Sequence, residues 1–188
     1  MSEISKITQL LKLLRAKVES ETPRIVTTAA FSVLAELQDR IFRDGKAADD
    51  SQIGSYSSDE IWIKIPYQGV NNSRFKKKGK PKGKDKKAKE TKETMYFVGG
   101  YSEFRKKAGR QNDKVDLSLS GELARNVIVG KKGDSIVIGI STSENVKKAE
   151  SLEKMYKKTI FKLTNEEKSL FLRIINRELE TLFKNIFS

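Results

Sequence analysis

The chain has 188 residues, of which 37% are hydrophobic and 34% are charged, and its formal net charge is +13; this length suits a single domain, residues 1–188, with a modest core. It contains no cysteine and no histidine, which excludes disulfides, zinc sites with Cys ligands and the usual general base near neutral pH. We find neither a signal peptide nor a run of about 20 apolar residues that would span a bilayer, so we expect a soluble protein that is made in a cytoplasm and binds no membrane.

Two amphipathic helices are predicted at the N-terminal end. Apolar residues recur at three- and four-residue steps between residues 3 and 18, which is the period of a helix. The pair Thr22–Pro23 then predicts a break, because threonine is a good N-cap and proline is favoured at the first helical position. A second helix is expected over residues 23–43, and Gly45 stands where a left-handed C-terminal cap belongs.

A basic segment lies between two predicted strands, at residues 61–65 and 95–98, both rich in aromatic and β-branched residues. With two acids, residues 74–92 carry +9 of the net charge of the chain. Its eleven basic residues are Arg74, Lys76, Lys77, Lys78, Lys80, Lys82, Lys84, Lys86, Lys87, Lys89 and Lys92. We therefore interpret residues 66–94 as a lysine-rich hairpin arm or a disordered insertion within the domain.

The second half of the chain alternates short strands and helices. A short helix is predicted over 101–108, and Ser120 is the predicted N-cap of another with Leu123 facing inward. Strands at 127–129 and 135–140 form a predicted hairpin around the turn 130–134.

Two further helices are predicted to end the chain. The first covers residues 144–158. Its predicted inward residues are Val146, Ala149, Leu152, Met155 and Tyr156. Thr164 and Glu167 have the spacing of a capping box, which predicts a helix running toward residue 187. The fold class expected from these elements is α+β: a small antiparallel sheet of about four strands packed against long helices, with helices at both ends.

The basic segment has three possible uses. It would bind the phosphates of DNA or RNA by counterion release, without reading sequence, because it offers few aromatic residues for base stacking. It would equally serve as a solvated surface loop, or as an arm that becomes ordered against an acidic neighbouring subunit.

Catalytic chemistry finds few candidates. The acid pairs Asp49–Asp50, Asp59–Glu60 and Glu166–Glu167 are adjacent in sequence, so their side chains diverge. A serine nucleophile would lack a histidine base, and the turn at 130–133 lacks the spacing of a phosphate-binding loop. We expect no catalytic residue, no metal and no cofactor; a nuclease that holds a metal through Asp49 and Asp50 is the alternative from the enzyme class.

Several short sequence segments resemble segments of the neck, tail-completion and virion-morphogenesis proteins of tailed bacteriophages. The run Leu119-Ser120-Gly121-x-Leu123 is similar to a family motif in which a threonine and a glycine open a short helix before a strand. The run Phe161-x-Leu163-Thr164 is similar to the start of the closing helix of that family. Residues 40–45, 53–57 and 138–140 add weaker matches in the same order.

This resemblance implies a structural virion protein without catalytic residues. The family fold is a small antiparallel sheet on a long helix, and its members assemble into rings, commonly six- or twelve-fold, on the portal or tail axis. The implied partners are copies of itself, the portal, adjacent neck or tail proteins and packaged DNA, and the implied location is the virion, after synthesis in the cytoplasm of the host bacterium. The main alternative is a free nucleic-acid-binding protein that uses residues 74–92.

Overall fold

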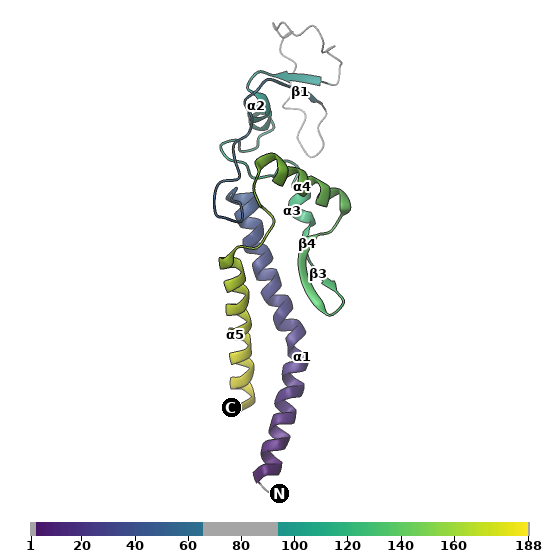
Figure 1. Cartoon of the computed structure of the whole chain (residues 1–188), viewed down its shortest axis with the longest axis vertical. Helices are drawn as coiled ribbons and strands as arrows, with labels where there is room; N and C mark the ends of the chain where they lie inside the picture. The colour runs from purple at the N-terminus through teal and green to yellow at the C-terminus, as the bar shows by residue number, and fades with distance from the viewer. Residues whose placement is uncertain (1–2, 66–93, 188) are drawn as a thin grey trace.

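The computed structural model describes residues 3–65 and 94–187 and has the predicted α+β class. Helix α1 (Glu3–Gln38) runs along the long axis of an elongated molecule, and α5 (Asn165–Phe187) lies antiparallel beside it (Figure 1). The strands and the shorter helices gather beside and beyond the C-terminal end of α1. The N-terminal end of α1 extends past the end of α5.

The predicted break at Pro23 is wrong, because α1 continues through that residue. Proline removes one backbone donor and crowds the preceding turn, at a cost of about 3 kcal/mol. On one side of it Val18 is half-buried, and on the other Ile25 is buried. Packing on both sides therefore offsets the local cost. Thr22 does not cap a new helix; its hydroxyl donates to the carbonyl of Val18 at 2.7 Å.

The predicted second helix changes its winding before it ends. Residues Asp39–Arg43 form a π-helix, η1, in which the amide of Asp44 donates to the carbonyl of Asp39 at 2.9 Å. The predicted left-handed cap is confirmed, since Gly45 has a φ of +68°. A Cβ on this residue would lie 2.5 Å from the carbonyl oxygen of Val115. Only glycine allows the chain to turn here and pack against the segment that precedes the family motif.

The four strands are confirmed, but they form two separate hairpins instead of one sheet. Strands β1 (Ile61–Lys64) and β2 (Thr94–Phe97) pair antiparallel. Strands β3 (Val127–Lys132) and β4 (Ser135–Ile140) pair through a two-residue turn, shorter than predicted. The second hairpin packs on α1, whereas the first packs on α2. Each hairpin thus has its own helical support, so the described strands need no common sheet.

Three short helices complete the body. Helix α2 (Gly100–Lys107) matches its prediction, and α3 (Glu122–Asn126) begins after Gly121. The predicted inner face of α4 (Ser143–Tyr156) is partly wrong, because Val146 and Met155 are exposed and Asn145 is buried instead. The face that packs inward contains Asn145, Ala149, Leu152 and Tyr156. Because the first residue of this face, Asn145, is polar, the spacing of apolar residues alone does not predict the face.

Two clusters of buried side chains form the core of the described chain. The larger one joins α1, η1 and the β3–β4 hairpin to the segments before α3 and α5. Its buried members are Leu34, Leu37, Ile41, Ala47, Ile53, Val115, Val127 and Ile160. The smaller one joins the β1–β2 hairpin to α2 and consists of Ile63, Phe97, Phe104 and Ala108. Ion pairs and hydrogen bonds between these clusters position the family motif.

Candidate functional site

Residues 119–123, the run that resembles the first family motif, form a loop that leads into α3 and then directly into β3. Leu123 is buried, as predicted. The helix cap is displaced by one residue from the prediction, since Gly121 occupies the cap position with a φ of +74°. Ser120 still contributes, because its hydroxyl accepts from the amide of Glu122 at 3.3 Å. The motif therefore needs glycine for the backbone and serine for one orphan donor of the helix.

A buried ion pair fixes the start of this loop. The guanidinium of Arg105 donates to the carboxylate of Asp116 at 2.8 Å, and both side chains are nearly inaccessible. The same carboxylate oxygen accepts from the hydroxyl of Tyr56 at 2.9 Å and from the amide of Ser118 at 2.9 Å. Asp116 thus ties α2 to the strand-like segment that enters the motif. Leu117, which lies between Asp116 and Ser118 in the chain, adopts a left-handed conformation with a φ of +49°.

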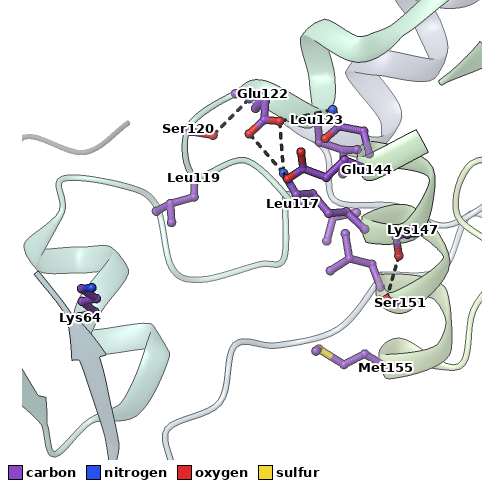
Figure 2. Close-up of a pocket in the computed structure, with 14 residues that line it drawn as sticks. Lys64, Leu117, Leu119, Ser120, Glu122, Leu123, Glu144, Lys147, Ser151 and Met155 are labelled. Atoms are coloured by element: carbon purple, nitrogen blue, oxygen red, sulfur yellow. Dashed lines mark hydrogen bonds and ion pairs between the residues drawn. The ribbon is translucent and has the colours of Figure 1, made fainter. Parts of the chain in front are cut away.

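The motif loop and α4 enclose a groove of about 780 Å³. Figure 2 shows the loop on one side, with Leu119, and α4 on the other, with Met155. The apolar lining of the groove is Leu117, Leu119, Leu123, Leu152 and Met155. The motif residues thus form one wall of an open apolar surface, although only Leu123 among them is buried.

Charged side chains form the polar end of this groove. Lys148 contacts Glu144 at 3.0 Å and Glu122 at 3.2 Å. The hydrogen bond from Lys148 lowers the pKa of Glu122, and the bond to Glu144 raises the pKa of Lys148. Glu122 therefore stays ionised and paired at neutral pH, so it is not poised as a general base. The amide oxygen of Asn145 is buried beside them without a hydrogen-bond partner in the described structure.

The acid pairs considered for metal binding do not converge. Asp49 accepts from the amide of Ser51 at 3.1 Å, and Asp50 pairs with Lys46 at 2.9 Å. Glu167 faces the protein interior, whereas Glu166 is exposed. Within residues 3–65 and 94–187, no group of three acidic side chains lies close enough together to hold a metal ion.

The second family motif begins α5 through the predicted capping box, which is confirmed. The amide of Thr164 donates to Glu167 at 2.8 Å, and the amide of Glu167 donates to the hydroxyl of Thr164 at 3.0 Å. Phe161 and Leu163 are half-buried against the larger core cluster. Glu167 also meets Arg40 of η1 at 2.7 Å. Sequence analysis did not identify Arg40, Arg105 or Asp116, because a single charged residue carries no sign of being buried.

The basic segment lies outside the described residues, so the eleven basic side chains of residues 74–92 have no structural account. The structure does describe the two strands that flank the segment. Strands β1 and β2 pair antiparallel, from Ile61 with Phe97 to Lys64 with Thr94. The segment therefore connects two adjacent strands, as predicted. The β1–β2 hairpin itself rests on α2.

The N-terminal part of α1 exposes a row of large apolar side chains, which we call the N-terminal stripe. Its members are Ile4, Ile7, Leu10 and Leu11, whereas the exposed Leu13 lies on the opposite side of the helix. Ile4 is 76% exposed, and the others are exposed as well. Monomeric proteins rarely leave a contiguous apolar surface open to water, and such a surface usually marks an interaction site.

None of the helices within residues 3–65 and 94–187 combines the length and apolar composition that a bilayer crossing requires. Comparisons of the chain with protein-family models, with curated proteins and with solved structures gave no match.

Proposed function

We propose that the protein is a non-enzymatic structural component of a tailed-bacteriophage virion, forming an oligomeric ring in the neck, the head–tail connector or the tail-completion complex. The sequence support is the order of the two family motifs. In the fold, the first leads through α3 into β3, and the second caps α5. The described side chains offer paired carboxylates and buried ion pairs, which suit a scaffold.

The observation that carries this proposal is the exposed N-terminal stripe. Burying a large aliphatic side chain stabilises a structure by about 1.5–3 kcal/mol, and this energy is not gained while the stripe faces water. A chain that exposes leucine and isoleucine over about two helical turns gains that energy on association. Assembly with further copies, the portal or adjacent neck and tail proteins would supply the cover.

The strand hairpins offer further contacts of the kind that an assembly uses. Each described hairpin is a separate two-stranded sheet, and short sheets of this kind can add a strand from a neighbouring subunit. The β3–β4 hairpin also presents the apolar side chains Ile128 and Val137 on its outer face. These surfaces support a subunit that contacts neighbours through several elements at once.

The test is the mass of the purified protein, alone and mixed with a portal, by native mass spectrometry or light scattering. We expect a discrete closed oligomer, six- or twelve-fold, and we expect the polypeptide in purified phage particles. A chain that stays monomeric alone and with the portal, and that is absent from the particles, would contradict the proposal.

A second candidate function is sequence-nonspecific nucleic-acid binding by the free protein. The observation that favours it is the net charge of +9 on residues 74–92, inserted between two adjacent strands. In a ring, the same segment would face packaged DNA or an acidic neighbouring subunit. Deleting the segment separates the two functions, because a ring would survive the deletion and a simple DNA-binding protein would lose its activity.

A further inference from the structure

Helix α5 carries a second apolar row, on a different side from the row that packs on α1. Leu172, Leu179 and Phe183 follow one another at steps of seven and four residues, which places them on one face. We call this row the outer stripe. Leu172 is 60% exposed, Leu179 is half-buried and Phe183 is 38% exposed, whereas Ile174 and Leu182 are buried. Phe183 therefore lies at the surface and not in the core.

The N-terminal stripe continues the seam along which α1 already meets α5. Ile4, Ile7, Leu11, Leu14 and Val18 alternate in steps of three and four, the spacing of a helix–helix seam. Leu14 and Val18 are half-buried, whereas the preceding members are exposed. The change coincides with the end of α5, since α1 extends past it (Figure 1). A helix with an apolar row would continue this seam over the exposed members.

The two rows match in chemistry. The N-terminal stripe spans seven residue steps and the outer stripe spans eleven, about 10 Å and 16 Å along their helices, so the outer stripe is long enough to cover the N-terminal stripe. Both consist of large aliphatic or aromatic side chains at helical spacing. One copy cannot bring its own two rows together, because α1 is a continuous helix held against α5 by the buried residues Ile25 and Ile174 and by the ion pair between Arg24 and Glu178 at 3.6 Å.

Charge favours α5 over the other candidate partners. Residues 3–18 have four basic residues and one acid, a net charge of +3. Pairing this segment with its own copy would bring +3 against +3. The groove beside α4 has three lysines and two glutamates in its lining, a net charge of +1. Helix α5 has four basic and four acidic residues, so its net charge is zero and it repels the segment least.

We propose that the N-terminal stripe of one copy packs on the outer stripe of α5 in the next copy. The contact joins two different surfaces, so it is heterologous, and a heterologous contact that closes on itself makes a ring. Each subunit then contributes a third helix to the α1–α5 pair of its neighbour. This inference rests on the proposed self-assembly and names the surfaces that carry it.

Disulfide mapping tests the contact cleanly, because the natural chain has no cysteine. Ile7 lies near the middle of the N-terminal stripe, and the exposed Asn176 lies near the middle of the outer stripe, so the two meet in either helix direction. The variant Ile7→Cys/Asn176→Cys should give, on oxidation, a ladder of covalent oligomers up to the ring size. Ile7→Cys/Arg177→Cys is the matched control, since Arg177 lies one residue along and off the stripe.

Two outcomes of the mapping would overturn the inference. Dimers of Ile7→Cys alone would show that the stripe pairs with its own copy. A ladder from Ile7→Cys/Met155→Cys, with none from the Asn176 pair, would place the stripe in the groove.

A charge substitution measures the same contact without crosslinking. Ile7→Asp should raise the concentration at which half of the protein is assembled by about tenfold or more, because a charge enters an apolar contact. Gln9→Asp adds the same charge on the other side of the helix and should leave that concentration within about twofold. An assembled wild type that is equally unaffected by both changes overturns this inference and leaves the proposed function standing. A wild type that never assembles overturns both.

Discussion

The guanidinium of Arg40 and the carboxylate of Glu167 meet at 2.7 Å in the protein interior, 127 residues apart in the chain. Glu167 uses its second oxygen to accept from the amide of Thr164, so one carboxylate both caps α5 and pairs with η1. Arg40 also donates to the carbonyls of Lys46, Ile160 and Lys162. The π-helix turns Arg40 inward, where it joins the end of α1 to the start of α5. This pair sets the relation between the two long helices.

Removing the charge of Arg40 tests that relation. Arg40→Met should lower the free energy of unfolding by about 3–5 kcal/mol, because it leaves the buried carboxylate of Glu167 without its cation. Urea denaturation followed by circular dichroism measures the loss. Arg43→Met is the matched control, since Arg43 lies in the same π-helix but pairs with Asp39 and Asp44 at the surface. The control should leave the denaturation midpoint nearly unchanged; equal effects of the two substitutions would contradict a structural role for the buried pair.

Tyr56 gives a pH-dependent test of the network that holds the family motif. Burial raises the pKa of its hydroxyl above the ordinary value. The folded state thus favours the neutral phenol, so the stability that it contributes is complete below about pH 10, the ordinary pKa of tyrosine, and is lost as pH rises further.

Tyr56→Phe should therefore lower the free energy of unfolding by about 1–2 kcal/mol at pH 7, because Asp116 loses a buried hydrogen bond. The difference from wild type should shrink above about pH 10. Denaturation of both proteins between pH 7 and 11 measures it. Tyr96→Phe, whose hydroxyl bonds the exposed Glu60, should cost less. A difference that stays constant with pH would argue against a buried, neutral Tyr56.

The glycine of the first family motif is expected to matter for its backbone conformation. Gly121→Ala should lower the free energy of unfolding by about 1–2 kcal/mol, since an L-residue is disfavoured at its positive φ. Space is not the obstacle, because a Cβ would meet only the end of the flexible Arg125 side chain, at 2.9 Å. Gly139→Ala is the control, as no atom lies within 4 Å of its Cβ position. Thermal denaturation should show no loss of stability for Gly139→Ala. A similar loss of stability in both variants would contradict a requirement for glycine at the positive φ of residue 121.

Local signals predicted the elements whose causes are local. The capping box of Thr164 and Glu167, the cap at Gly45 and the strands on either side of the basic segment are decided by residues within a few positions of one another. The same holds for the α3 start, which the motif placed to within one residue. The exposed N-terminal residues were predicted to form a helix, and they do.

Features decided by distant contacts escaped prediction. Pro23 stands inside α1 because packing on both sides outweighs its local cost, and no local pattern reports that packing. The strands divide into two hairpins because one packs on α1 and the other on α2. The groove beside α4 depends on the buried Asn145, and the motif loop depends on the pair of Arg105 with Asp116. The spacing of apolar residues predicts only the apolar part of a core, so it does not identify charged and amide side chains that are buried there.

The basic segment predicts a separable, salt-sensitive activity. Replacing the eleven basic residues of 74–92 with glutamine keeps the length of the segment and changes its net charge from +9 to −2. We expect binding to a double-stranded DNA fragment, measured by fluorescence anisotropy, to weaken by about a hundredfold or more at 50 mM salt. The slope of log affinity against log salt should fall toward zero, because each phosphate contact that is lost removes about 0.9 from it. The mass of the assembled protein should not change.

The control for this substitution is the tip of the β3–β4 hairpin, where Lys131→Gln/Lys132→Gln removes two exposed charges from the described body. It should change the salt slope by no more than about 2, since at most two phosphate contacts are lost. Undiminished DNA binding by the glutamine variant would remove the segment from any role with nucleic acid. Loss of assembly in that variant, with DNA binding unchanged, would instead make the segment a contact between subunits, as an arm ordered against an acidic neighbour requires.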